Sequence, residues 1–181
     1  MPAIIQDTLP KEALLGRYAD GDAYVDCYAM DVPRRVDLGG YIAAFYTSRV
    51  FKVERALLGL VARKPAGDDD ARRLAADQAE RFSAWTVEAR GADQILLRCG
   101  RTRSWLMVAP PDGAAHGVRL YFGSAVLPKG RAAGGRPAFD FPVHALSGFH
   151  RWYTKTLMRS AYANLPATPE ANLEKRVLRE R

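Results

Sequence analysis

Residues 83–127 contain four short runs with strand-like character, and a long aromatic-rich helix is predicted after them, over residues 141–165. Strands that follow one another at short spacing pair antiparallel, and a helix of this length can cover one face of their sheet. The pattern therefore predicts a curved antiparallel sheet wrapped around a C-terminal helix, a shape that can enclose a cavity. The four runs are SAWTVEA (83–89), QILLRC (94–99), TRSWLMVA (102–109) and GVRLYFGSAVL (117–127).

The third of these runs indicates that both faces of the sheet carry apolar groups. Side chains alternate along a strand, so Arg103, Trp105 and Met107 share one face. Leu106 and Val108 share the other face with the hydroxyl side chains of the run. We expect the C-terminal helix to pack on one face and something else to cover the other.

One strand and two short helices are predicted ahead of the sheet. The run AYVDCYAM (23–30) alternates with a period of two, as a strand does. Asp37 is a favourable N-cap for a helix over 38–46, and Ser48 for a second helix over 49–64.

A third helical run is predicted between these helices and the sheet. It covers ARRLAADQAERF (71–82), and Asp70 is its expected N-cap. Asp77 and Arg81 are spaced to form an i,i+4 ion pair on its exposed side. Residues 68–82 are therefore interpreted as helical, although a strand in this region would enlarge the sheet.

Three other segments are assigned outside the sheet and its helices. Residues 1–21 are predicted to be a lead-in with one short helix that begins near Pro10. The loop 128–140 is rich in Gly, Pro and Arg, and we expect it to be flexible and able to act as a lid. Residues 166–181 are predicted to be a basic C-terminal tail.

Length and charge limit the classes of function. The chain of 181 residues fits one domain, and its net charge of +7 comes from 27 basic and 20 acidic residues. The basic residues are dispersed rather than arrayed with aromatic residues, so we expect no nucleic-acid partner. No apolar run approaches the roughly 18 residues of a transmembrane segment. We also find no secretory signal and expect a cytoplasmic protein.

Cys27 and Cys99 are the two cysteines of the chain, and each lies in an apolar strand-like run. We interpret them as buried, reduced thiols that behave as small apolar groups. The alternatives are a disulfide between them or a paired redox site.

The chain lacks the spacings that carry metal, phosphate or nucleophile chemistry. His116, His144 and His150 are the three histidines, and the last two are not spaced as zinc ligands on a helix. There is no CxxC pair, no GxSxG elbow and no phosphate-binding glycine loop. We therefore predict no metal, no cofactor and no assignable catalytic residue.

Candidate ligand-binding residues come from the sheet and the closing helix, because pockets in such folds are mostly aromatic and apolar. Arg103 could bind an acidic group of a ligand with its guanidinium fork. The alternative is that most of the aromatic residues are core, and that Arg103 lies along apolar surface or pairs with Glu88. The candidates are Trp85, Arg103, Trp105, Tyr121, Phe149 and Tyr153.

The order of one strand, two helices, antiparallel strands and a long final helix resembles the START-like, or SRPBCC, helix-grip superfamily. The segments DLGGYIAAFYTSRVFKVERALLGLV, RTRSWLMVAP and FPVHALSGFHRWYTKTLMRSAY resemble its uncharacterised DUF2867 type within residues 22–165. The resemblance implies an α+β domain with a hydrophobic cavity between sheet and helix. It implies no catalytic residues, and the helical character of 68–82 departs from the usual pattern.

These observations lead to one expected function and two alternatives. The expected function is the binding of a small hydrophobic or amphipathic ligand in the cavity. The first alternative is a cyclase- or hydrolase-like enzyme, which needs His144 or His150 near a carboxylate or near Arg103. The second is an interaction module whose final helix and tail contact an acidic partner or a membrane surface.

Overall fold

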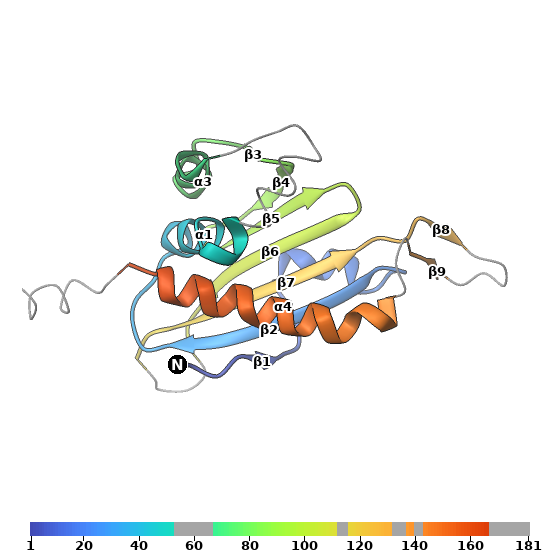
Figure 1. Ribbon diagram of the computed structural model, residues 1–181, viewed down its shortest axis with the longest axis horizontal. Coiled ribbons are helices and arrows are strands. Elements are labelled where there is room, and N and C mark those ends of the chain that lie inside the picture. The colour runs from blue at the N-terminus through green and yellow to red at the C-terminus, as the bar shows by residue number, and fades with distance from the viewer. Residues whose placement is uncertain (53–66, 112–115, 132–136, 140–142, 167–181) are drawn as a thin grey trace, which may run out of the picture.

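The computed structural model describes residues 1–52, 67–111, 116–131, 137–139 and 143–166, with the backbone alone for 143–150. Seven strands of this part form one antiparallel sheet in the order β1-β2-β7-β6-β5-β4-β3 (Figure 1). The strands are β1 (Ile5–Gln6), β2 (Tyr24–Val32), β3 (Arg81–Phe82), β4 (Trp85–Arg90), β5 (Gln94–Cys99), β6 (Thr102–Ala109) and β7 (Val118–Val126).

Four helices that accompany this sheet lie wholly within the described part of the chain. They are the 3-10 helix η1 (Leu14–Tyr18) and the α-helices α1 (Leu38–Tyr46), α3 (Asp68–Ala75) and α4 (Val143–Asn164). A separate two-stranded hairpin consists of β8 (Gly130–Arg131) and β9 (Pro137–Ala138). The predicted α+β class, with an antiparallel sheet and a long C-terminal helix, is confirmed. The sheet is open, because β1 and β3 are its edges.

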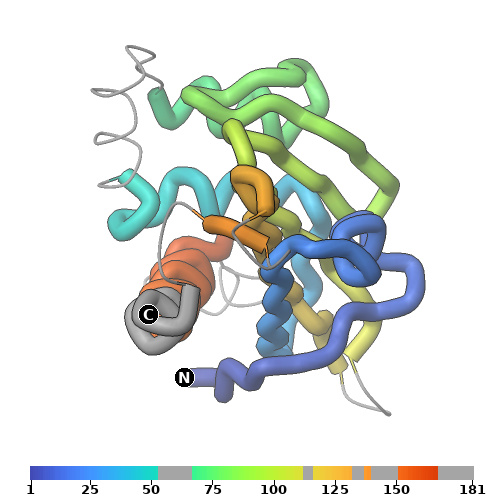
Figure 2. The backbone as a smooth tube through the Cα atoms, turned by 90° about the vertical axis from the view of Figure 1, so that its right-hand side faces the viewer, coloured from blue at the N-terminus to red at the C-terminus, as the bar shows by residue number. Residues whose placement is uncertain are grey.

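The described elements form three layers, which Figure 2 shows edge-on. The helices α1 and α4 lie on one side of the sheet, which we call the helix face, and the N-terminal segment lies on the other side. The helix face buries Tyr28, Leu106 and Phe122 of the central strands against Phe45 of α1 and Leu157 of α4. This face holds the larger of the two clusters of buried apolar residues in the described part of the chain.

The opposite side of the sheet, which we call the strap face, is covered by the N-terminal segment. Leu15 of η1 is fully buried there against Trp105, Tyr121 and Leu96. β1 pairs with β2, so residues 1–21 extend the same sheet as well as covering it. The expectation that something other than the C-terminal helix covers this face is confirmed, and the N-terminal segment is what covers it.

Gly123 is the position that lets η1 approach the sheet. It lies at the centre of β7, opposite Cys27 on one side and Trp105 on the other. A Cβ atom there would stand 2.7 Å from Leu15 Cδ2 and 3.0 Å from Trp105 Cε3. Only glycine leaves room for the Leu15 side chain. Gly123 therefore sets the distance between the sheet and the N-terminal segment of residues 1–21, which we call the strap.

The predicted cap of α1 is confirmed, and that of the next helix is confirmed at its start. The Gly40 backbone N–H donates to Asp37 Oδ1 over 2.7 Å. Residues 49–52 are helical, and the Phe51 N–H donates to Ser48 Oγ over 3.4 Å. The remainder of that predicted helix, from residue 53, lies outside the described residues.

The predicted helix over 71–82 is wrong at both ends. α3 begins at Asp68, and Asp70 accepts a hydrogen bond from the Gly67 N–H over 2.7 Å instead of capping the helix itself. The helix ends in a Schellman motif: the N–H of Gln78 donates to the Arg73 carbonyl, and Asp77 has φ 57°. Glycine usually occupies that left-handed position, and its absence from the sequence concealed the end of the helix.

The residues after this turn form strands instead of helix. Arg81–Phe82 is β3, and Phe82 is buried on the helix face. The predicted ion pair between Asp77 and Arg81 is therefore replaced: Arg90 Nε lies 2.9 Å from Asp77 Oδ1. The sheet gains a strand where the sequence pattern predicted helix.

The other predictions fall partly on described residues. The predicted strands are confirmed, within a few residues of their expected bounds, at 23–30, 83–89, 94–99, 102–109 and 117–127. The predicted loop 128–140 contains the β8–β9 hairpin, which extends beyond the end of the main sheet (Figure 1). Residues 132–136 and 140 of that loop, and 167–181 of the predicted tail, lie outside the described part. No described helix is long and apolar enough to cross a membrane.

Both cysteines are free, as expected; Cys27 is buried as predicted, whereas Cys99 is only half-buried. Cys27 is buried on the strap face and Cys99 packs against the core of the helix face, so the sheet separates them. Burial raises the pKa of the Cys27 thiol to about 12, and nearby Asp7 and Asp26 add to this effect. A thiol with such a pKa is protonated at neutral pH and unreactive.

We predict that Gly123→Ala lowers the free energy of unfolding by about 1–3 kcal/mol, because the added methyl group overpacks against Leu15 and Trp105. Urea unfolding followed by circular dichroism measures this. The control is Gly130→Ala in β8, where a Cβ would meet nothing within 4 Å. Equal stability of the two variants would show that Leu15 is not held against Gly123.

Candidate ligand-binding pocket

A half-open pocket of about 200 Å³ lies between the helix face of the sheet and α4. Four strands supply its floor, α1 and the helical turn after Ser48 supply one wall, and α4 supplies the roof. The described residues that line it are Phe45, Phe51, Trp85, Cys99, Thr102, Arg103, Ser104, Phe122, Ser124, Tyr153, Thr154 and Leu157.

Aromatic side chains make the apolar wall of the pocket. Phe45 of α1 stacks on Phe122 of β7 with 5.0 Å between ring centroids, and it contacts Phe51 at 6.0 Å. Trp85, the first residue of β4, is 6% exposed and belongs to the same core. Offset aromatic pairs of this kind add stability beyond the area that they bury. The wall is therefore rigid and suited to an apolar or aromatic guest.

Hydroxyl groups of the central strands make the polar part of the floor. Ser104 of β6 and Ser124 of β7 are opposite each other in the register and alternate onto the helix face. Ser104 Oγ lies 3.3 Å from the Tyr46 hydroxyl. Ser124 Oγ donates to Asp26 Oδ1 over 2.7 Å, and the Ser124 N–H donates to the same oxygen over 3.0 Å. These contacts hold both serine side chains in place.

Two other buried polar groups of the pocket, unlike these serines, lack a hydrogen-bond partner among the described residues. Trp85 Nε1 and Thr154 Oγ1 are shielded from water and have no hydrogen-bond partner in the described part of the chain. Thr154 is fully buried on the inner side of α4, one turn before Leu157 and Met158. An unpaired buried donor costs about 1–3 kcal/mol. The pocket thus has two groups that a bound molecule could satisfy.

Three of the six predicted site residues line this pocket: Trp85, Arg103 and Tyr153. The side chain of Phe149 lies outside the described residues. Trp105 and Tyr121 stand on the strap face with their ring centroids 5.9 Å apart, buried under η1. The sheet separates these two residues from the pocket.

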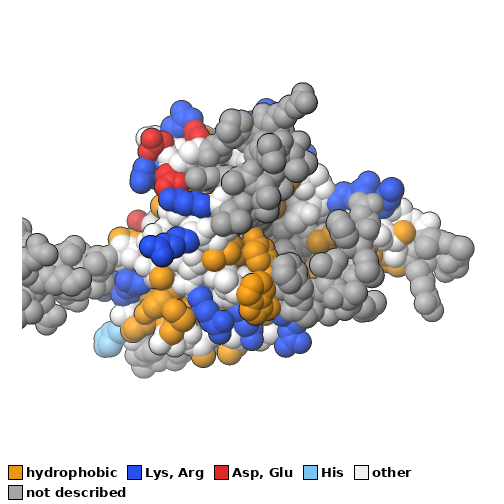
Figure 3. Space-filling model, in the orientation of Figure 1, with side chains coloured by type: hydrophobic (Ala, Val, Ile, Leu, Met, Phe, Trp, Pro, Cys, Tyr) orange, Lys and Arg blue, Asp and Glu red, His pale blue; other side chains and the backbone are white. Residues whose placement is uncertain are grey.

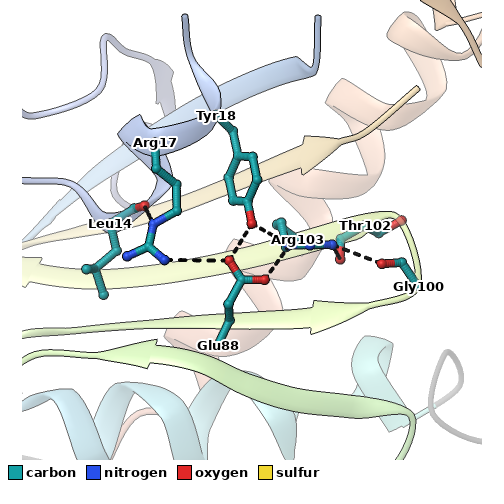
Figure 4. Close-up of polar contacts among 7 residues, drawn as sticks. All are labelled: Leu14, Arg17, Tyr18, Glu88, Gly100, Thr102 and Arg103. Carbon is teal, nitrogen blue, oxygen red and sulfur yellow. Dashed lines mark hydrogen bonds and ion pairs between the residues drawn. The ribbon is translucent and has the colours of Figure 1, made fainter. Parts of the chain in front are cut away.

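Arg103 borders the pocket, but its guanidinium group is engaged on the strap face (Figure 4). Its Nε lies 2.6 Å from Glu88 Oε2 and donates to the Tyr18 hydroxyl over 3.0 Å. Its Nη1 donates to the Gly100 carbonyl over 2.9 Å. The alternative expectation for Arg103, a pair with Glu88, is confirmed. The side chain is part of a structural network and is not directed at a ligand.

Further polar contacts attach the N-terminal segment to the strap face. Gln94 Oε1 accepts from the Leu14 N–H over 2.8 Å and from Trp105 Nε1 over 2.9 Å. Gln94 Nε2 donates to the Glu12 carbonyl over 3.0 Å. The side-chain amide of Gln94 therefore binds the backbone of the N-terminal segment and the buried indole of Trp105 at the same time. The aromatic residues of this face contact protein instead of ligand.

A buried arginine makes the second of these attachments. Arg119 is 5% exposed, and its Nη2 donates to Asp7 Oδ2 over 2.8 Å. Its Nη1 lies 3.2 Å from Asp31 Oδ2 on the neighbouring strand. Breaking such a buried pair leaves an uncompensated charge, which is strongly destabilising.

Sequence reasoning missed Thr154 and the two serines of the floor. For Thr154 a signal existed, because it lies three and four residues before Leu157 and Met158 on the buried stripe of the helix. A hydroxyl on an apolar stripe is unusual and indicates a buried polar function. For Ser104, alternation along TRSWLMVA gave the correct face but not the pocket, and Ser124 was not assigned a face.

The requirements of the enzyme alternative fall largely outside the described part. The side chains of His144 and His150 are not among the described residues, and Arg103 is held by Glu88. Within the described residues, no group of three His, Cys, Asp or Glu side chains is placed to bind a metal ion. Asp26 is the carboxylate next to the pocket, and its contact with Ser124 joins β2 to β7.

Comparison with protein-family models, with curated proteins and with solved structures gave no match for this chain.

We predict that Glu88→Gln lowers the free energy of unfolding by about 2 kcal/mol, because the largely buried guanidinium of Arg103 loses its charged partner. Glu80→Gln, an exposed glutamate before β3, is the control. Chemical unfolding at pH 7 measures both. Occupancy of the pocket should stay unchanged in Glu88→Gln. If this variant instead loses ligand binding but keeps its stability, Arg103 is a ligand anchor and not part of a structural pair.

Proposed function

We propose that this protein binds a small hydrophobic or amphipathic molecule in the pocket between the sheet and α4. The observation that carries the proposal is the half-open aromatic pocket of about 200 Å³, which includes the two buried unpaired groups of Trp85 and Thr154. Pockets that bind small molecules are largely apolar with a few placed polar groups, and this pocket has that composition.

The volume limits the size of the guest. A dry apolar cavity of about 150 Å³ is enough to hold a benzene molecule. The pocket is slightly larger than that, so a molecule with one ring and a short substituent fits the described space. Phe45, Phe51 and Phe122 would contact the ring of such a molecule.

The helix-grip arrangement of the START-like superfamily, and its DUF2867 type, is part of this proposal. Support comes from the order of elements and from α4, which packs against the sheet beside α1. The open sheet and the strap of residues 1–21 are features that the resemblance did not imply. Two free thiols support a reducing, cytoplasmic location.

Native mass spectrometry of protein purified from its cells tests the proposal. We expect a retained small molecule in the native protein and its loss in Thr102→Trp, which fills the pocket from the first residue of β6. Thr86→Trp, on β4 and away from the pocket lining, is the matched control and should retain the molecule. The absence of any bound molecule, together with equal binding of an apolar dye by all three proteins, would contradict the proposal.

A second candidate function rests on the outer side of α4. Trp152 is 60% exposed, and Arg151 and Arg159 are exposed near it. The sequence of α4 contains no acidic residue. Figure 3 shows Lys and Arg side chains along this helix, while the acidic side chains in that view gather over α3. An exposed indole beside basic groups is typical of surfaces that contact anionic membranes.

For this second function, we predict sedimentation of the protein with vesicles that contain phosphatidylglycerol. The double variant Trp152→Ala with Arg159→Glu should reduce the bound fraction about tenfold or more at 0.1 M salt, since each basic group contributes roughly 1 kcal/mol near an anionic surface. Arg98→Glu, an exposed arginine of β5, is the control. Binding that is insensitive to salt, or equal on phosphatidylcholine vesicles, would exclude the function.

A further inference from the structure

The two unpaired groups of the pocket define the chemistry of its guest more closely than its shape does. Resting on the proposed binding function, we infer that the bound molecule is uncharged and presents a hydrogen-bond acceptor, such as a carbonyl oxygen, to Trp85 Nε1 and Thr154 Oγ1.

The two buried indoles of the chain make the case for Trp85. Trp105 Nε1 donates to Gln94 Oε1 over 2.9 Å, so its hydrogen-bonding capacity is met inside the protein. Trp85 is 6% exposed, yet its Nε1 has no partner among the described residues. An indole N–H is a donor only, so whatever satisfies it must be an acceptor. Because Trp85 lines the pocket, the guest is the acceptor that we assign to it.

Thr154 repeats the argument from the opposite side of the pocket. It is fully buried on α4, and its hydroxyl has no partner within the described part of the chain. Two other hydroxyls of the lining are engaged, Ser104 with Tyr46 and Ser124 with Asp26. Trp85 and Thr154 are thus the described lining residues whose buried donor atoms lack a partner, and these donors come from the sheet and from the helix respectively.

The charges around the pocket indicate that the guest is neutral. Among the described lining residues, Arg103 is the one that carries a charge, and Glu88 pairs with its guanidinium on the strap face. Asp26 is not among the lining residues, and its carboxylate accepts two hydrogen bonds from Ser124. A charged guest would find no counter-ion in this lining, and an unpaired buried charge is far more costly than an unpaired dipole.

Three probes of similar size separate these possibilities: ethylbenzene, acetophenone and benzoate. Each has one benzene ring, and they differ in having no acceptor, a neutral acceptor and an anionic acceptor. We expect acetophenone to bind about tenfold more tightly than ethylbenzene, the ratio that one neutral hydrogen bond supplies. Benzoate should bind more weakly than either.

The indole N–H signals in a ¹⁵N-correlated NMR spectrum report the contact directly. The chain has three tryptophans, and Trp85→Phe assigns the signal of Trp85 by its loss. Acetophenone should move that signal downfield, as a new hydrogen bond does, and ethylbenzene should not. The signals of Trp105, which is bonded to Gln94, and of exposed Trp152 serve as internal controls.

Two conservative variants complete the test. Trp85→Phe should bring the affinity ratio of acetophenone to ethylbenzene to within about twofold of one. Thr154→Val should weaken acetophenone about threefold or more while raising the melting temperature of the empty protein by about 3 °C, because a buried unpaired hydroxyl is removed. The matched controls are Trp152→Phe and Thr156→Val, both on α4 and outside the pocket lining.

The outcomes distinguish this inference from the proposed function. If ethylbenzene binds as tightly as acetophenone, or if benzoate binds best, the inference is overturned while the pocket remains a binding site. If the Thr154→Val variant keeps full affinity for acetophenone and the Trp85 signal does not move, the assigned donors are wrong. If none of the three probes binds and purified protein carries no molecule, the proposed function fails as well.

Discussion

The fold depends on a sheet whose central strands are apolar on both faces and must be covered on both. β6 carries Trp105 and Met107 to one side and Leu106 to the other, and neither side can be left in water. The helices cover one face, and the first residues of the chain cover the other. Gly123, Gln94 and Arg119 are the positions that make this second cover possible.

The two covers differ in how completely they fill the space over the sheet. The strap lies close because Leu15 packs directly over the missing side chain of Gly123, and polar contacts fix its backbone. The helical cover leaves the pocket of about 200 Å³, because small Ser and Thr side chains stand where bulky residues would close it. The strap face is thus tightly packed, whereas the helix face keeps a space in which a small molecule can bind.

Much of this architecture follows from local patterns. Alternation placed Tyr28, Trp105 and Leu106 on their correct faces, and side-chain capping located the start of α1 at Asp37. The partner of the strap face could not be predicted, because its contacts join residues that are 80 to 112 positions apart. From the sequence, Arg103 had two alternative roles, ligand anchor or partner of Glu88, and the contact between β4 and β6 side chains decides for Glu88. Asp77 concealed the end of α3 because it occupies a position where glycine is usual.

The strap also determines when the sheet can be completed. Leu14 is hydrogen-bonded to Gln94, Tyr18 to Arg103 and Asp7 to Arg119. The N-terminal segment is synthesised first, but its partners lie on strands that are synthesised much later. Pairings of such high sequence separation slow folding, since the long loop must close before the contacts repay it. During synthesis, β5, β6 and β7 follow the N-terminal segment and α1, and α4 comes last. The N-terminal segment can therefore make all of its contacts only after most strands of the sheet have formed.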